Sequence, residues 1–162
     1  MLDKQGIYHY LHERGIPFVV TEHPAVYNMD EISKVDLPYP EADAKNLFIR
    51  DDKKKHYYLL SVKGDKRVDL KAFRRSQGLR PLSFASAAEL KEKLGLIPGA
   101  VTPLGLLNDE ERSVTFYLDK AFLGGLIGVH PNDNTATIWL KTEDLLKVIK
   151  AWGNAVQVVD FI

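Results

Sequence analysis

The chain has 162 residues, no cysteine, and equal numbers of basic and acidic residues, 22 of each. This length fits one domain with a real hydrophobic core, and 45% hydrophobic with 27% charged residues excludes a disordered, collagen-like or coiled-coil chain. Without cysteine there can be no disulfide, thiolate nucleophile, iron–sulfur cluster or cysteine-type zinc site. Because no signal-peptide core or membrane-length apolar run is present, we expect a soluble, cytoplasmic protein with no membrane partner.

The charge is unevenly distributed along the chain. Residues 1–44 carry three basic and eight acidic side chains, residues 45–80 carry twelve and four, and residues 81–162 carry seven and ten. The middle segment therefore has a net charge of +8, which is typical of a surface that faces nucleic acid or phosphate. On composition alone, a solvated face that pairs with the acidic flanks is the favoured explanation.

Alternating short helices and strands are predicted from the amino terminus onward. A first helix begins after Asp3 and ends at Gly15, because apolar residues recur between them at helical spacing. A strand rich in β-branched residues follows at 16–23. A capping signal at Asn28 then predicts a short helix that ends near Leu37.

The basic middle segment predicts a hairpin followed by two helices. Strands at 46–51 and 56–62 are joined by a charged turn. Helices are predicted at 69–77 and 87–94, each with a capping residue at its start and a glycine after its end. The next stretch, 95–109, is rich in glycine and proline yet almost uncharged, so we expect a loop packed against the rest of the protein.

Four more strands are predicted, at 113–119, 126–129, 135–140 and 155–161. Thr142 is expected to cap a helix over 143–152 before the last of them. The whole chain, 1–162, is therefore predicted to form a single α/β domain. Its sheet should be curved, mixed and mainly antiparallel, with helices flanking it.

The common catalytic motifs are missing: the sequence has no GxSxG elbow, Walker loop, GxGxxG fingerprint or HExxH pair. His130 is the histidine best placed for a functional role, because it follows an apolar strand at the strand's end. Lys45 opens another apolar strand and could place an ammonium group in a cleft, although a lysine that simply reaches water fits the same pattern. His9 and His12 stand three residues apart on a helix, and a solvated pair is favoured over a metal site.

Four segments in order make the sequence resemble a known family. They are KNLF from Lys45, LLSVKGDKRVDLK at 59–71, GAVTPLGL from Gly99, and VHP at 129–131. In this combination the chain resembles the bacterial prolyl-tRNA editing family, which includes YbaK, the free-standing ProX-type proteins and the editing insertion of bacterial prolyl-tRNA synthetase. The resemblance is greatest to the free-standing Ala-tRNA(Pro) deacylases and implies a YbaK-like fold.

The resemblance implies hydrolysis of the ester between a wrong amino acid and the terminal adenosine of proline tRNA. Lys45 would hold that adenosine and its phosphate, Gly99 would offer backbone N–H groups to the ester carbonyl, and His130 would line the pocket. The implied substrate-binding residues are Asn46, Ser61, Val101, Thr102 and Pro103. The expected tRNA-binding residues are Lys63, Lys66, Arg67, Lys71, Arg74 and Arg75, whose phosphate contacts would give salt-dependent affinity.

Such a reaction needs no cofactor, metal or protein nucleophile, because an aminoacyl ester is already activated. Water can be positioned by backbone groups and the neighbouring ribose hydroxyl, while N–H donors stabilise the oxyanion. The short side chains of 99–106 favour an alanyl ester, with a cysteinyl ester as the alternative, since one small pocket discriminates poorly between them. The expected partners are proline tRNA and prolyl-tRNA synthetase, not DNA. A non-catalytic module that binds an aminoacyl-adenosine or tRNA, and a protein-interaction domain, remain as other hypotheses.

Overall fold

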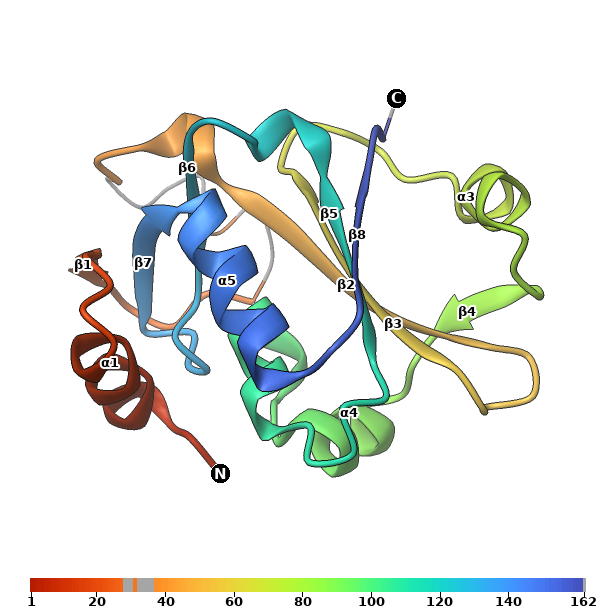
Figure 1. The fold of residues 1–162 in the computed structure, drawn as a ribbon, viewed down its shortest axis with the longest axis horizontal. Coiled ribbons are helices and arrows are strands. Elements are labelled where there is room, and N and C mark those ends of the chain that lie inside the picture. Colours follow the sequence, from red (N-terminus) through yellow and green to blue (C-terminus); the bar gives the residue numbers. More distant parts are fainter. Residues whose placement is uncertain (28–30, 32–36, 162) are drawn as a thin grey trace.

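Two β-sheets form the centre of the computed structural model, which describes residues 1–27, 31 and 37–161 (Figure 1). The larger sheet has the strand order β4-β2-β3-β5-β8 and the smaller one β1-β7-β6. The strands of the larger sheet are β2 (Ala44–Asp51), β3 (Tyr57–Lys63), β4 (Leu82–Phe84), β5 (Thr115–Asp119) and β8 (Val156–Val159). Those of the smaller sheet are β1 (Val19–Glu22), β6 (Leu126–Val129) and β7 (Ala136–Lys141).

Among the described residues, four of the six strand pairings are antiparallel, and β3 with β5 and β5 with β8 are parallel. The predicted mixed, mainly antiparallel architecture is therefore confirmed. It differs from the prediction in two details. The strands divide into two sheets, linked by an isolated bridge between Asp43 and Gly128, and the three-residue strand β4 was not predicted.

The α-helices with bounds in the described part of the chain are α1 (Lys4–Glu13), α3 (Leu70–Gln77), α4 (Ala87–Leu94) and α5 (Thr142–Trp152). The first three are capped as the sequence predicts, by the side chains of Asp3, Asp69 and Ser86. The short helix predicted between Asn28 and Leu37 falls almost wholly outside the described residues.

The prediction that Thr142 caps the last helix is wrong. Thr142 is the first residue of α5, and its buried hydroxyl has no hydrogen-bond partner among the described residues. The helix follows directly on β7, so Lys141 occupies the cap position without a side-chain cap. The main-chain N–H of Thr142 instead donates to the carbonyl of Gly125.

The proline-rich stretch after α4 packs into the core, as its apolar composition predicts. It forms two short 3-10 helices, η2 (Pro98–Ala100) and η3 (Pro103–Asn108), each beginning at a proline. Every residue of η3 is buried. Two further 3-10 helices, η1 (Pro40–Ala42) and η4 (Lys120–Phe122), precede β2 and follow β5.

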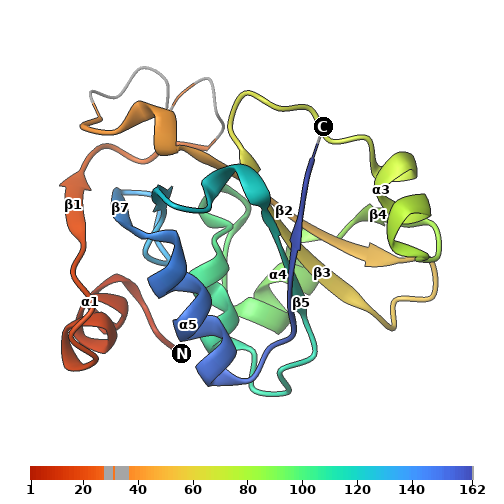
Figure 2. The ribbon, with the colours of Figure 1, turned by 45° about the horizontal axis from the view of Figure 1, so that its top comes forward.

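The main core lies between the two sheets and is closed by α4, α5 and η3, as Figures 1 and 2 show. A second cluster lies on the other face of the larger sheet, under α3. There Phe73 of α3 packs edge-on against Tyr117 and stacks on Phe161. Helix α3 is thereby held far from β6 and β7 in both views.

Candidate active site at the free edge of β2

Strand β2 leaves part of one edge uncovered. It pairs with β3 over Ala44–Arg50, but on its other edge β4 covers only residues 49–51. The carbonyl of Phe48 accepts a hydrogen bond from Ala85 on this edge. Because alternate residues of a strand direct their main-chain groups to the same side, Asn46 also turns its N–H and C=O toward this edge. A ligand can therefore find hydrogen-bonding partners there.

A cavity of about 200 Å³, open to solvent, lies along this edge. It brings together five residues that the sequence analysis singled out: Lys45, Asn46, Gly99, Val101 and His130. The other lining residues, which that analysis did not assign to the site, are Val26, Tyr27, Asp43, Ala44, Pro98, Gly128, Val129 and Thr137. The five residues singled out from the sequence come from three segments far apart in the chain, which thus meet at one place.

Three predicted substrate-binding residues do not line this cavity. Ser61 is fully buried on β3 and donates from its hydroxyl to the Asn46 side-chain carbonyl, 2.5 Å away. Thr102 is also fully buried and caps η3 by accepting from the Leu104 N–H. Pro103 is a buried residue at the start of η3. In the structure these residues support the wall rather than form it.

The ammonium group of Lys45 is held by the loop that follows β3. Its Nζ donates to the main-chain carbonyl of Lys66 at 2.5 Å. The Lys66 side chain in turn makes an ion pair of 3.0 Å with Asp119, whose side chain is completely buried. The same carboxylate accepts from the main-chain N–H groups of Lys63 and Ala121, each at 3.0 Å. One buried carboxylate therefore fixes the loop on which Lys45 rests.

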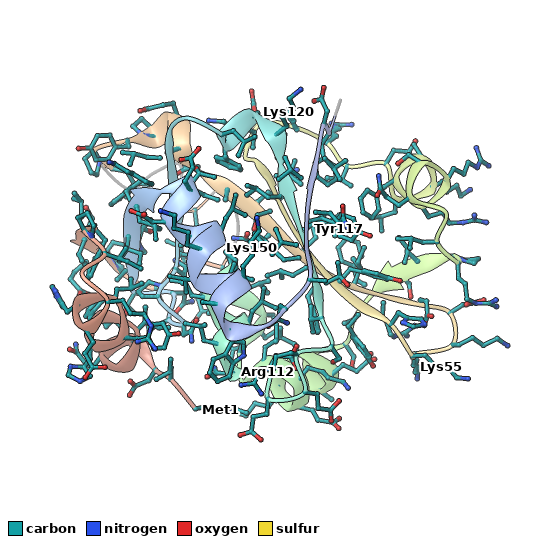
Figure 3. The ribbon with its side chains drawn as sticks, in the orientation of Figure 1. Met1, Lys55, Arg112, Tyr117, Lys120 and Lys150 are labelled. Atoms are coloured by element: carbon teal, nitrogen blue, oxygen red, sulfur yellow. The ribbon has the colours of Figure 1, made fainter. Side chains whose placement is uncertain are left out.

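The predicted tRNA-binding residues fall into two groups. Lys63 and Lys66 are tied down beside the cavity, since Lys63 Nζ donates to the carbonyl of Glu41 at 2.7 Å. The second group lies on or just before α3. Its members are Arg67, Lys71, Arg74 and Arg75, and within the described residues their side chains make no hydrogen bond or ion pair. Figure 3 shows side chains of this region projecting outward from the molecule.

His130 presents a neutral imidazole to the cavity. Its Nδ1 lies 2.8 Å from the carbonyl oxygen of Ala136, and since a carbonyl can only accept, Nδ1 carries the proton. Burial lowers the pKa of His130 below its ordinary value, and His23, whose ring centre is 6.1 Å away, acts in the same direction, while the hydrogen bond to Ala136 and the charge of Asp133 oppose them. Because the ring is neutral at pH 7, Nε2 keeps its lone pair. His23 itself bonds through Nε2 to Thr137 at 2.8 Å.

Gly99 allows a close approach at the cavity wall. A Cβ atom there would lie 2.6 Å from Cδ1 of Tyr27 and 3.1 Å from Nδ2 of Asn134. Asn134 also holds the segment before Tyr27, by donating to the carbonyl of Val26 at 2.8 Å. A side chain at position 99 would therefore have to displace the Tyr27 ring from the cavity wall, while the backbone conformation there does not itself demand glycine.

Asp43 is a cavity residue that the sequence analysis did not assign. It lies directly before β2, in a short acidic stretch that also contains Glu41. Burial and the neighbouring Glu41 raise the pKa of its carboxyl to about 6, while Lys63 lowers it. Tyr27 was not predicted from the sequence, because the segment around it carries no recognisable motif.

Within the described ranges, no group of three or more histidine, aspartate or glutamate side chains could hold a metal ion. No helix in that part of the chain is long and apolar enough to cross a membrane.

The aminoacyl-tRNA editing domain profile matches residues 23–148, so the chain belongs to this family. Over 158 residues, 97% of the chain, it is 40% identical to the prolyl-tRNA editing protein ProX of Acetoanaerobium sticklandii and covers 96% of that protein. It is 37% identical to the prolyl-tRNA synthetase associated domain-containing protein 1 of Mus musculus, over 88% of this chain and 86% of that one.

A solved structure described as a candidate trans-editing enzyme for prolyl-tRNA synthetase shares the fold. It superposes with a TM-score of 0.71 at 24% identity, covering 99% of this chain and 98% of that one. The YbaK-like architecture that the sequence resemblance implied is therefore confirmed.

Proposed function

We propose that this protein is a trans-editing hydrolase that removes alanine from mischarged Ala-tRNA(Pro). The observation that carries the proposal is the cavity at the free edge of β2, where Lys45, the main chain at Gly99 and the neutral ring of His130 converge. Membership of the editing family and the similarity to ProX favour an aminoacyl-tRNA substrate over other esters.

The reaction adds water to an ester. The oxygen of water forms a bond to the carbonyl carbon, and the bond from that carbon to the ribose oxygen breaks. One proton of the water ends on the released ribose oxygen, so the products are alanine and a tRNA with a free terminal hydroxyl. No group other than water is consumed.

The residues of the cavity divide this work between them. Lys45 binds the phosphate of the terminal adenosine as a point charge. The main-chain N–H of Gly99 stabilises the oxyanion of the tetrahedral intermediate, a contribution of about 3–4 kcal/mol for one donor. Nε2 of His130 accepts a hydrogen bond from the attacking water or from the neighbouring ribose hydroxyl, because its lone pair is free.

The small size of the cavity favours a short amino-acid side chain. Val101 and Pro98 form part of its apolar wall, and its volume of about 200 Å³ leaves little space beside an ester and a ribose. One extra small group changes binding in such a pocket by only about 1–3 kcal/mol. A cysteinyl ester therefore remains the alternative substrate.

The proposal is tested by a deacylation panel on one tRNA. Proline tRNA is charged separately with alanine, cysteine, serine and proline, and the release of each amino acid is followed with and without the protein. We expect the alanyl ester to be hydrolysed fastest and the prolyl ester to be spared. Fastest release of cysteine would replace alanine in the proposal, and no release of alanine, cysteine or serine would overturn it.

A further inference from the structure

Asp43 is the single carboxylate among the described residues that line the cavity. Its main chain is fixed from three directions. The N–H donates to the carbonyl of Pro40 at 3.3 Å, the carbonyl accepts from Gly64 at 3.0 Å, and the residue bridges to Gly128 of β6. The carboxylate is therefore attached to a well-anchored position, two residues from Lys45.

The Asp43 side chain lacks the partners that other buried carboxylates have. Asp119 accepts three hydrogen bonds, and Asp109 accepts from both Val114 and Asn154. Within the part of the chain that the structure describes, the partly buried carboxylate of Asp43 makes no hydrogen bond or ion pair. Since a buried charge without a partner is unfavourable, a cationic ligand group would stabilise it.

The charges of the cavity complement those of an aminoacyl-tRNA end. Among the described lining residues there is one ammonium group, Lys45, and one carboxylate, Asp43, while the ring of His130 is kept neutral. The substrate end carries one phosphate and, at neutral pH, one α-ammonium group on the amino acid. If Lys45 takes the phosphate, the carboxylate is the matching partner for the ammonium.

We propose that Asp43 binds the α-ammonium group of the aminoacyl ester, an inference that rests on the proposed function. With a pKa of about 6, the carboxyl is mostly ionised at pH 7 and can form this contact. Glu41, Lys45, Lys63 and His130 are the titratable groups around it, and only Lys63 lowers its pKa.

This contact would also select against esters whose amine is blocked. A peptidyl or formyl group on the nitrogen removes the positive charge, and the carboxylate would then face a neutral amide. The site would therefore act on aminoacyl-tRNA and spare peptidyl-tRNA.

The test uses two esters of the same proline tRNA at pH 7. One is alanyl, and the other is lactyl, in which a hydroxyl replaces the ammonium in an almost identical shape. Each is incubated under single-turnover conditions with wild-type protein, Asp43→Asn and the control Glu41→Gln. Glu41 is an exposed carboxylate two residues away that does not line the cavity, and its contact with Lys63 is made by its main chain.

We expect Asp43→Asn to slow hydrolysis of the alanyl ester by about 10- to 100-fold, the range for a charge-assisted hydrogen bond. Hydrolysis of the lactyl ester should change by less than about 3-fold, and Glu41→Gln should leave both rates near wild type. An equal loss on the two esters, or no loss on the alanyl ester, would overturn the inference. Wild-type protein that hydrolyses neither ester would overturn the proposed function, and this inference with it.

Discussion

The basic segment 45–80 contributes two groups of side chains that occupy different environments. In one group, the ammonium groups of Lys45, Lys63 and Lys66 each have a fixed partner beside the cavity. In the other group, Arg74 and Arg75 extend from α3 without a partner among the described residues, at the far end of the larger sheet (Figures 1 and 2). A single stretch of positive charge thus combines preorganised groups at a site with a solvated surface.

The difference shows what charge counting can and cannot reveal. Net charge identified the segment, but the partners of each cation depend on the packing of distant elements. Lys66 is fixed by Asp119 at the end of β5, 53 residues further along the chain. The tertiary structure therefore distinguishes the lysines beside the cavity from the arginines of α3, and net charge does not.

After the loss of Lys45, which is taken up last, the largest effect is expected from filling the cavity at Gly99. Gly99→Ala would place a methyl group 2.6 Å from Tyr27, whose exposed ring can move aside at little cost in stability. The displaced ring and the new methyl group would misplace the ester, so we expect single-turnover deacylation to fall by about 10- to 100-fold. Gly125→Ala is the matched control, because its new methyl group would lie 3.8 Å from the nearest neighbouring atom, the carbonyl oxygen of Phe122. Full activity of Gly99→Ala would argue against the cavity as the site.

A smaller effect should follow from loosening the loop that holds Lys45. Asp119→Asn keeps an acceptor for one of the two main-chain N–H groups, replaces the other acceptor with an NH2 group, and removes the charge that pairs with Lys66. We expect the free energy of unfolding to fall by about 1–3 kcal/mol, which lowers the melting temperature. We also expect KM to rise about 10-fold, because Lys45 would bind phosphate less well. If Asp119 only stabilises the fold, KM will stay constant while the melting temperature falls.

Asp43 should make the folded protein less stable as the pH rises, whereas most carboxylates of folded proteins do the reverse. Its folded-state pKa of about 6 lies above the ordinary value of 3.8, so folding takes up a proton between these values and the free energy of unfolding decreases as pH rises through them. Asp43→Asn removes this penalty. The free energy of unfolding of Asp43→Asn, relative to that of wild type, should be about 1 kcal/mol more favourable to the folded state at pH 8 than at pH 4, allowing for solvent screening. Urea unfolding measures the two free energies. The same difference between variant and wild type at both pH values would contradict a raised pKa at Asp43.

The smallest effect is expected on α3. Reversing charge with Arg74→Glu and Arg75→Glu should weaken tRNA binding by a few fold at moderate salt and flatten its salt dependence by about one unit of slope per lost phosphate contact. Hydrolysis of a short aminoacylated acceptor end should not change. Unchanged tRNA affinity, measured by filter binding over a salt series, would assign these arginines to a solvated surface.

Much of the fold was predictable because local signals agree with the final structure. Alternation and β-branched residues located most strands, and the caps at Asp3, Asp69 and Ser86 located three helices. The failures are positions where tertiary contacts override local preference. Thr142 is a good capping residue, yet the direct connection from β7 places it inside the helix.

The site was predictable only in part. Family resemblance led to Lys45, Gly99 and His130, which do meet at one cavity. Asp43 and Tyr27 reach it through the bridge to β6 and the packing on Gly99, contacts that no spacing in the sequence encodes.

The central claim is that the cavity at the free edge of β2 hydrolyses an aminoacyl ester, and Lys45 gives its most direct test. Single-turnover release of alanine from Ala-tRNA(Pro) should be compared for wild type, Lys45→Met and Lys55→Met. Lys55 is an exposed lysine at the opposite end of the sheet (Figure 3). We predict that Lys45→Met remains folded and loses about 100- to 1,000-fold in rate, whereas Lys55→Met matches wild type. Equal rates for all three proteins would contradict the claim.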